Sequence, residues 1–430
     1  MGFFGLKRGE MLDLKFIREN ADLVKKAVLN KNEKCDIDNI IKLDKQKREL
    51  QFEFDNLRAE QNKVSKQIPV MKKAGEDVRE ILKQMGMIST KLKNITSELS
   101  DLNDTMNSQL LAVPNIPDPQ VPVGDESKNE FVRKWGKKQE FDFKPLDHLA
   151  LADKNNLLEL QRATKMAGSG FAGYIDKGAR LERALINFML DFHIQKHDYI
   201  EVSLPILVNR PTMTGTGQLP KLEDDMYHIN EDDLFLVPTA EVSVTNLYSK
   251  EIHNHTDLPI RHVCYSPCFR REAGSYGKDT KGLQRLHQFN KVEMVRFVKP
   301  ENSYNVLEEM TNDAEEILQA LGLHYRVVML ATGDLSFASA KTYDLEVWAP
   351  GAGKYLEVSS ISNFEDFQAR RASIRYRDEN GKVKYVHTLN GSGLATPRTF
   401  IALIETYQNS DGSIIVPKVL QPYLGGLEKI

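Results

Sequence analysis

The sequence has 430 residues, of which 41% are hydrophobic and 28% are charged, and its formal net charge is −3. A chain of this length exceeds what one hydrophobic core usually supports, so we expect two domains. The near-neutral charge excludes a protein that attracts nucleic acid through overall basicity, and no apolar run approaches the ~20 residues of a membrane span.

The chain has three cysteines, Cys35, Cys264 and Cys268, which are too few for a disulfide framework and fit a reducing cytoplasm. Cys264 and Cys268 are not followed by a second cysteine or histidine pair at the spacing of metal ligands. We therefore expect buried thiols, no zinc and a cytoplasmic location.

Met11 could be the true start of the protein, with residues 1–10 as an upstream extension. Residues 1–10 contain too short an apolar stretch for a secretory signal. We expect them to form an N-terminal extension outside the fold.

Residues 38–110 are expected to form an antiparallel coiled-coil hairpin, here called the arm. Apolar residues recur in steps of three and four on both sides of a short break, as in a coiled-coil seam. Pro69 and Gly75 in this break are expected to stop the first helix. A thin hairpin has no broad core, so the arm should serve as a lever or a probe. The expected seam residues are Ile40, Leu43, Leu50, Phe54, Leu57, Val64, Ile68, Val78, Ile81, Met85, Ile88, Leu92, Ile95, Leu99, Leu102 and Met106.

Positive charge gathers at the far end of the arm, where residues 63–93 carry eight basic and three acidic side chains. An ordinary solvated helix surface is one interpretation. The favoured interpretation is contact with the phosphates of a nucleic acid, because Lys and Arg gain affinity there by releasing counterions. The candidate contacts are Lys63, Lys66, Lys72, Lys73, Arg79 and Lys83.

Residues 113–130 contain four prolines and are expected to be a stiff linker between an N-terminal domain, residues 11–112, and a second domain, residues 131–430. In the second domain the pattern predicts a helix over 178–197, then a strand over 198–208. Later strand-like runs cluster in neighbouring pairs, and a helix follows near the end. This order predicts an α+β domain with an antiparallel sheet. The later strands are expected at 234–239, 260–271, 290–299, 324–330, 342–350 and 354–362, and the last helix at 398–408.

Arg270, Glu272 and Phe289 together suggest a nucleotide site. If Arg270 and Glu272 lie two apart on one strand, both side chains face the same side of the sheet. A guanidinium there can hold a phosphate or a carboxylate, a glutamate can accept from an exocyclic amine, and an aromatic ring can stack on a base. A simple ion pair between strands is the alternative.

Two further carboxylates are candidates for an amino-acid pocket. Glu293 lies inside an otherwise apolar strand, where an unpaired carboxylate would be costly, and Glu241 follows Thr239 after a short strand.

Hard oxygens and an arginine mark the remaining candidates. Glu357 and Ser359 are expected on one face of a strand with Ser360 nearby, which suits Mg²⁺ with phosphates. Ser392 lies between glycines, and Arg398 follows at the start of a helix, where it could contact a triphosphate. Each feature alone has an ordinary structural explanation. The interpretation therefore rests on the order in which all these features occur along the chain.

In that order, the motifs resemble the class II aminoacyl-tRNA synthetases and, among them, the bacterial-type seryl-tRNA synthetase family. Residues 11–20 are similar to the family's opening. Residues 178–208, 268–294 and 389–405 are similar to the three class motifs. The resemblance covers almost all of the chain from Met11 onward.

The resemblance implies an antiparallel-sheet catalytic domain and a tRNA-binding arm. It implies an enzyme that activates L-serine with ATP and Mg²⁺ and transfers the seryl group to tRNA(Ser) and, where one exists, to the selenocysteine tRNA. It also implies a homodimer built on the first motif.

Site residues follow from the same resemblance, position by position. Arg270, Glu293 and Arg398 would be catalytic, and Glu357 with Ser360 would hold Mg²⁺. The implied ATP-binding residues are Arg270, Arg271, Glu272, Leu286, Phe289, Glu357, Val358, Ser359, Ser360 and Arg398. The implied serine-binding residues are Thr239, Ala240, Glu241, Arg270, Glu293, Asn390 and Ser392.

Two other functions remain alternatives at this point. One is a related enzyme that charges a carrier protein, although such an enzyme has little use for a long arm. The other is a catalytically silent coiled-coil protein that binds RNA or serves as a scaffold, although an intact set of charged site residues disfavours it.

Overall fold

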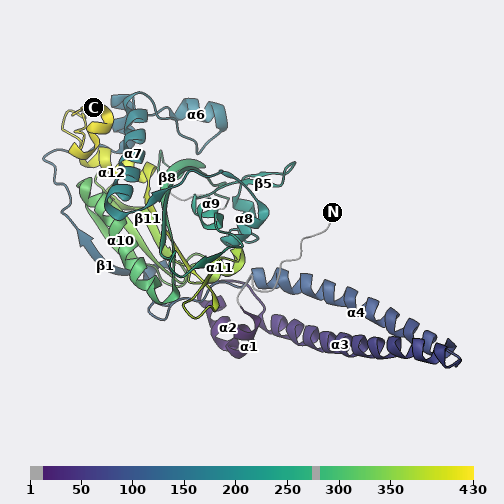
Figure 1. Cartoon of the computed structure of the whole chain (residues 1–430). Helices are drawn as coiled ribbons and strands as arrows, with labels where there is room; N and C mark the ends of the chain where they lie inside the picture. Colours follow the sequence, from purple (N-terminus) through teal and green to yellow (C-terminus); the bar gives the residue numbers. More distant parts are fainter. Residues whose placement is uncertain (1–12, 274–280) are drawn as a thin grey trace. The chain divides into compact units, whose positions relative to one another are not determined.

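The computed structural model of the protein describes residues 13–273 and 281–430. The described chain divides into two units, one ending at Pro114 and the other running from Asn115 to Ile430 (Figure 1). The expected extension at residues 1–10 lies outside the described residues.

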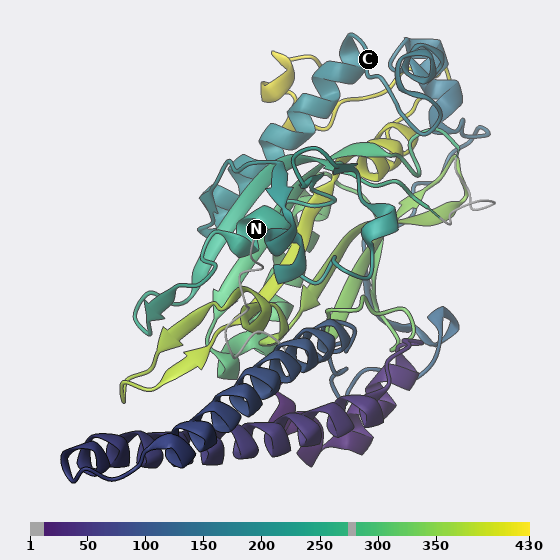
Figure 2. The same cartoon turned by 90° about the vertical axis from the view of Figure 1, so that its right-hand side faces the viewer.

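The first unit contains two short helices, α1 (Leu14–Glu19) and α2 (Ala21–Asn30), followed by the arm. The arm consists of α3 (Ile37–Lys73) and α4 (Arg79–Leu111), which lie side by side in both views (Figures 1 and 2). This confirms the expected antiparallel hairpin. All expected seam residues are buried or partly buried, and Val64, Ile88 and Leu92 form the packed centre of its distal half.

The prediction that Pro69 stops the first helix is wrong. Pro69 lies inside α3, which continues to Lys73, and the turn follows at Gly75 with a φ of 70°. A proline within a helix removes the hydrogen bond to the carbonyl four residues earlier. Here that residue is Ser65, which is exposed, so water can satisfy its carbonyl group.

The proline-rich segment from Asn115 onward is part of the second unit. Asn115 donates from Nδ2 to the carbonyl groups of Ala338 and Phe364, at 2.9 Å and 2.8 Å. Val121 packs in a small buried cluster with Leu330 and Leu335. The segment is therefore fixed over at least this stretch.

The second unit is built on an eight-stranded sheet with the order β1-β9-β10-β11-β14-β8-β7-β2. Neighbouring strands are antiparallel except β2 and β7, which are parallel. This confirms the expected α+β class. The strands are β1 (Glu130–Trp135), β2 (Ile200–Glu201), β7 (Ile260–Phe269), β8 (Gln288–Val298), β9 (Tyr325–Met329), β10 (Lys341–Ala349), β11 (Lys354–Asn363) and β14 (His387–Ala395).

Helices cover both faces of this sheet (Figure 1). On one face, α7 (Lys177–His197), α10 (Ser303–Ala320) and α12 (Thr396–Thr406) pack into the main hydrophobic core. On the other face, α9 (Glu241–Asn246) and α11 (Phe367–Ala372) pack into a second, smaller core.

Strand β8 shows how the two faces differ. Val292 and Met294 enter the main core, whereas Val295 and Phe297 enter the second core. Because side chains alternate along a strand, Glu293 lies on the same face as Val295. The second face of the sheet therefore has a charged side chain, Glu293, toward one end of β8 and a hydrophobic core toward the other end.

The shorter elements surround this sheet. Helices α5 (His148–Asn155), α6 (Leu160–Ala167) and α8 (Arg210–Gly215) and short turns η1 (Glu126–Lys128), η2 (Glu223–Asp225), η3 (Pro300–Asn302), η4 (Lys418–Leu420) and η5 (Pro422–Leu424) complete the helical part. Two small sheets contain β3 (Leu207–Asn209), β4 (His228–Ile229), β5 (Leu234–Leu236), β6 (Ile252–Asn254), β12 (Arg375–Arg377) and β13 (Val383–Tyr385).

Several elements differ from the sequence prediction, including the following three. The strand expected over 198–208 is split into β2 and β3, and α10 and β14 were not predicted. Strand β14 contains two glycines that usually disfavour a strand. Here they allow close packing, because a Cβ on Gly391 would lie 2.7 Å from the Ile361 side chain, and one on Gly393 would lie 2.3 Å from His193.

Cys264 and Cys268 are buried free thiols, as predicted. Among residues 13–273 and 281–430, no helix is long and apolar enough to cross a membrane.

A buried histidine under β14 predicts loss of stability in acid. Ring Nε2 of His193 lies 3.0 Å from the Gly393 carbonyl oxygen, and Nδ1 lies 2.9 Å from Nδ1 of His197. Burial, with the nearby charges of His197 and Arg296, lowers the pKa of His193 to about 3. Below pH ~6.5 the unfolded chain binds a proton here that the folded chain does not, so the free energy of unfolding should fall as the pH falls.

At pH 5 this histidine should lower the free energy of unfolding by about 2 kcal/mol relative to its value at high pH. Urea unfolding at pH 8 and pH 5 measures how much the free energy of unfolding falls in acid, here called the acid loss. The acid loss should be smaller for His193→Gln than for the wild type. His255→Gln, at a partly exposed loop position, should keep the wild-type acid loss. An equal acid loss in wild type and His193→Gln would refute this source of the pH dependence.

Candidate active site

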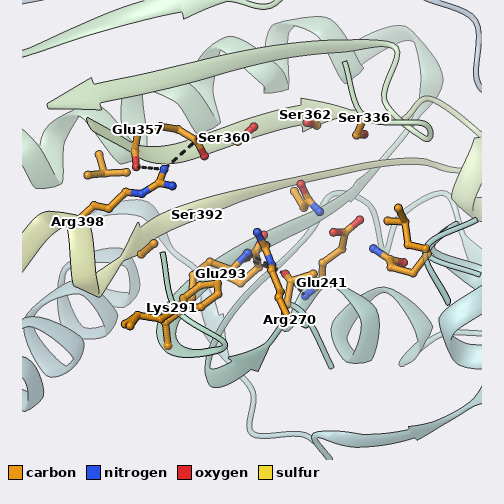
Figure 3. A pocket seen from close by; sticks show the side chains of 18 of the residues that line it. Glu241, Arg270, Lys291, Glu293, Ser336, Glu357, Ser360, Ser362, Ser392 and Arg398 are labelled. Atoms are coloured by element: carbon orange, nitrogen blue, oxygen red, sulfur yellow. Dashed lines mark hydrogen bonds and ion pairs between the residues drawn. The ribbon is translucent and has the colours of Figure 1, made fainter. Parts of the chain in front are cut away.

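The second face of the sheet contains a cavity of about 510 Å³. Its walls come from β8, β11, β14, the start of α12 and the segments that flank β7. Figure 3 shows Glu357, Ser360 and Arg398 at one end, and Glu241, Arg270 and Glu293 at the other. We call these the exposed end and the buried end.

The buried end is organised around Glu293, which is 2% exposed. Its carboxylate pairs with the ammonium group of Lys291 and accepts a hydrogen bond from Thr239 Oγ1 at 3.2 Å. Lys291 also donates to Thr239 Oγ1 at 2.9 Å, and Ser392 lies directly opposite Glu293 in the β8–β14 ladder. The pairing explains how β8 tolerates a buried carboxylate.

Glu241 adds a second buried carboxylate at this end. It begins α9, and its backbone N–H donates to Thr239 Oγ1 at 3.1 Å. Burial, together with the negative charge of Glu293, raises the pKa of Glu241 to about 7. A second buried carboxylate beside Glu293 suits a ligand with a cationic group.

Arg270 also belongs to the buried end (Figure 3), where it lies beside Phe289. Its guanidinium carbon lies 5.2 Å from the ring centroid of Phe289, and its Nε donates to the Pro238 carbonyl oxygen at 3.3 Å. The remaining guanidinium nitrogens can hold a phosphate or a carboxylate.

The expectation that Arg270 and Glu272 share a strand is wrong. Strand β7 ends at Phe269, and Glu272 has a φ of 53°, in the left-handed region. Glu272 nevertheless lines the cavity, and its carboxylate forms an ion pair with Arg285. The turn after β7, rather than strand alternation, brings both residues to the cavity.

At the exposed end, the expectation that Glu357 and Ser359 share a face is also wrong. In the β10–β11 ladder Ser359 pairs with Leu345 and Glu357 pairs with Glu346, so Val358 is the extra residue of a β-bulge. The bulge shifts the alternation by one, and Glu357 and Ser360 line the cavity. Ser359 is buried and donates to the Ser392 carbonyl oxygen at 2.5 Å.

Arg398 closes the exposed end through contacts with Glu357 and the chain before β8. Its Nη1 donates to the Glu357 carbonyl oxygen at 2.9 Å and lies 3.4 Å from the Glu357 carboxylate. Its Nε donates to the Gln284 carbonyl oxygen at 3.1 Å. Arg398 is thus held with one edge of its guanidinium toward the cavity (Figure 3).

The oxygen groups at the exposed end fit a divalent cation. Asp344 lies opposite Ser360 in the β10–β11 ladder and is buried, and one of its carboxylate oxygens has no hydrogen-bond partner. Burial and the charge of Glu357 raise the pKa of Asp344 well above its usual range, although Ser360 opposes this shift. An excess of carboxylate beside Glu357 and Ser360 suits Mg²⁺, which prefers hard oxygen ligands.

Most of the predicted site residues lie around this single cavity. Ala240, Arg271 and Ser359 do not line it: Ala240 is buried before α9, and the Arg271 side chain is exposed. The predicted residues that line the cavity are Thr239, Glu241, Arg270, Glu272, Leu286, Phe289, Glu293, Glu357, Val358, Ser360, Asn390, Ser392 and Arg398.

Sequence reasoning missed several residues that line the cavity. Lys291 could have been found, since it is two residues from Glu293 on the same strand and therefore on the same face. Thr216 and Gln218 come from a loop with no periodic signal, as does Phe337.

The antiparallel sheet and its polar cavity define the class of the protein. Residues 221–407 match the family described as the tRNA synthetase class II core domain (G, H, P, S and T). The second unit is therefore a class II aminoacyl-tRNA synthetase core.

The particular family follows from the rest of the chain. Residues 11–117 match the seryl-tRNA synthetase N-terminal domain. The chain is 52% identical to the serine–tRNA ligase of Thermodesulfovibrio yellowstonii over 96% of this chain and 99% of that protein, and 50% identical to that of Clostridium tetani over 98% and 100%. The chain belongs to the seryl-tRNA synthetase family and is a serine–tRNA ligase.

Solved structures agree with this assignment. The seryl-tRNA synthetase of Pyrococcus horikoshii, complexed with ATP, has a TM-score of 0.91 at 38% identity and covers 98% of this chain and 99% of its own. The cytoplasmic serine–tRNA ligase of Naegleria fowleri, in complex with AMP, has a TM-score of 0.85 at 30% identity over the same shares. A prolyl-tRNA synthetase from Giardia lamblia, at 18% identity and a TM-score of 0.55 over 64% of this chain and 54% of its own, shares the fold alone.

Proposed function

We propose that the cavity makes seryl-adenylate, with serine at the buried end and ATP at the exposed end. The observation that supports this most directly is that Arg270, which lies over the ring of Phe289, lines the same cavity as the carboxylates of Glu241 and Glu293. This arrangement can accept an ammonium group, a hydroxyl group and a phosphate together.

In the first step, an oxygen of the serine carboxylate attacks the α-phosphorus of ATP, and the bond to pyrophosphate breaks. Arg270 holds the carboxylate and the α-phosphate at reacting distance, and Arg398 neutralises charge on the nucleotide. Phe289 stacks on the adenine. No protein nucleophile is needed.

Glu357 and Ser360 would hold Mg²⁺, which when bound neutralises phosphate charge. Asp344 would support this arrangement from behind Ser360.

Specificity for serine rests on the hydroxyl group. Glu293 accepts a hydrogen bond from it, and this acceptor loses that partner when alanine binds. Glu241 faces the ammonium group, and Ser392 and Asn390 complete the wall.

In the second step, the terminal hydroxyl of tRNA attacks the carbonyl carbon of seryl-adenylate, and AMP leaves. We propose that the arm binds tRNA(Ser) through its exposed distal lysines and Arg79, and the selenocysteine tRNA where one exists. We also propose that the protein works in the cytoplasm as a homodimer. Strand β2 forms one edge of the large sheet, and Ile200 on this strand is 62% exposed. An exposed apolar side chain at a sheet edge supports a contact with a second subunit there.

The proposal is tested by serine-dependent exchange between ATP and pyrophosphate, followed by charging of bulk tRNA, with alanine and threonine as competing substrates. Exchange without tRNA charging would favour the carrier-protein alternative. RNA binding without exchange would favour the silent RNA-binding protein. Sedimentation equilibrium tests the dimer, and a monomer at working concentration would refute it.

Reversing the charge of four arm lysines should weaken tRNA binding and spare adenylate formation. The variant replaces Lys66, Lys72, Lys73 and Lys83 with Glu, and all four side chains are exposed. We expect tRNA affinity to fall by at least about 10³ at low salt, with a smaller salt dependence. Filter binding and pyrophosphate exchange would be measured together.

The matched control reverses four exposed lysines of the second unit, Lys128, Lys134, Lys137 and Lys144. It carries the same change of net charge, so a general charge effect would weaken tRNA binding equally in both variants. Equal weakening, or a parallel loss of exchange activity in the arm variant, would contradict the proposed role of the arm.

A further inference from the structure

A buried glutamine connects the buried end of the cavity to the helix behind it. Gln368 lies in α11, is 1% exposed and does not line the cavity. Its Nε2 donates to Glu241 Oε1 at 2.6 Å and to the Thr216 carbonyl oxygen at 3.3 Å, and its Oε1 accepts from Thr388 Oγ1 at 2.8 Å.

These partners fix the orientation of the Gln368 amide. A backbone carbonyl oxygen can only accept, so the NH₂ group must face Thr216, and it then also faces Glu241. A flipped amide would place its oxygen against two acceptors and its NH₂ group against Thr388. The amide therefore presents one N–H to Glu241 in a fixed direction.

The same helix supports the loop that closes the cavity near Thr216. The ring of Phe367 packs edge-on against Phe337 at 5.7 Å between centroids. A Cβ on Gly217 would lie 3.3 Å from the Phe367 ring, so this loop lies directly on α11. Glu241 and the Thr216–Gln218 loop are thus both anchored to one short helix.

We propose that Gln368 is a positioning residue for amino-acid recognition, which holds Glu241 as an oriented carboxylate for the α-ammonium group of the substrate. This inference rests on the proposed function of the buried end. A donated hydrogen bond favours the charged form of a carboxylate, and only that form attracts an ammonium group strongly. Gln368 acts through Glu241 and does not itself touch the substrate.

The electrostatics of Glu241 make this support necessary. Burial and Glu293 raise its pKa to about 7, whereas Gln368, Lys291 and Asn390 oppose the rise. Without the Gln368 amide, Glu241 should hold its proton to higher pH, and serine should bind less well at and below neutral pH.

The test compares Gln368→Met with the wild type in pyrophosphate exchange. Methionine has a similar length but cannot donate to Glu241. We expect the KM for serine to rise about ten- to a hundredfold at pH 6.5 and to rise less at pH 8.5, with the KM for ATP unchanged. L-glycerate, which has a hydroxyl group in place of the ammonium group, should inhibit both enzymes with the same Ki.

The matched control is Gln408→Met. Gln408 is also buried, accepts from the Leu146 N–H and donates to two backbone carbonyl groups, but it lies outside the cavity. Its KM for serine should stay at the wild-type value. A rise in the KM for ATP equal to that for serine, a pH-independent effect, or a weaker Ki for L-glycerate in Gln368→Met would overturn the inference.

Two further variants ensure that the test gives a clear result even if Gln368→Met does not fold. If Gln368→Met does not fold, Gln368→Glu replaces it. The carboxyl group introduced at position 368 would face Glu241 and could not support it as the amide does. The KM for serine must therefore exceed the wild-type value, and a wild-type value would overturn the inference. Glu241→Gln separates the two proposals, because a normal KM for serine in that variant would refute the role of Glu241 itself.

Discussion

Replacing Glu293 with alanine should lower kcat/KM for serine in pyrophosphate exchange by at least about 10³, with little change in the KM for ATP. Glu293 is the buried acceptor that we assign to the serine hydroxyl group, and a site built around such a hydrogen bond discriminates by about 10⁴ or more. The preference for serine over alanine should fall with it.

The structure also predicts a stability effect for Glu293→Ala, because Lys291 would remain buried without its carboxylate partner. Loss of one partner of a buried pair costs about 3–5 kcal/mol. The control is Glu405→Ala, which removes a buried carboxylate that accepts from the backbone of His148 and Ala352 outside the cavity. Both variants should unfold at a lower urea concentration than the wild type, but only Glu293→Ala should lose serine activation. Normal exchange in Glu293→Ala would refute the hydroxyl assignment.

Replacing Arg270 with alanine should lower kcat/KM for adenylate formation by about 10³ or more, with a fall in kcat. Arg270 is the cation between the serine carboxylate and the α-phosphate in the proposed reaction, and a positioned cation of this kind stabilises developing charge. Arg270→Lys should recover only part of the rate, since lysine cannot form two parallel hydrogen bonds.

The neighbouring residue provides the comparison. Arg271 has the same charge, but its exposed side chain does not line the cavity. Arg271→Ala should reduce exchange only a few-fold, which also tests the ATP-binding role expected for Arg271 from the sequence. Equal losses in the two variants would show that general charge, rather than the position of Arg270, supports the reaction.

The sequence predicted the parts of this protein that depend on local patterns. The seam of the arm follows from spacing alone, and it is packed as expected around Val64 and Leu92. Glu293 was identifiable because a carboxylate among apolar strand residues requires a partner. Its ion-pair partner Lys291 is two residues away on the same strand and was identifiable too, whereas its hydrogen-bond partner Thr239 lies 54 residues away along the chain.

The errors have a common physical origin. The bulge at Val358 and the end of β7 before Arg270 are set by pairing with other strands, and a single strand carries no signal of its register. Gln368 was missed for a related reason. Its role depends on contacts with Thr216 and Thr388, which come together only in the folded chain.

The extra residue in β11 decides which serine of this strand reaches the cavity. If the chain slipped by one residue so that Val358 paired with Leu345, Ser359 would face the cavity and Ser360 would turn away from it. Deletion of Val358 would instead leave Ser359 opposite Leu345 and Ser360 opposite Asp344, so both serines would keep their present faces. The exposed end of the cavity should therefore tolerate a shorter strand at this point better than a shifted one.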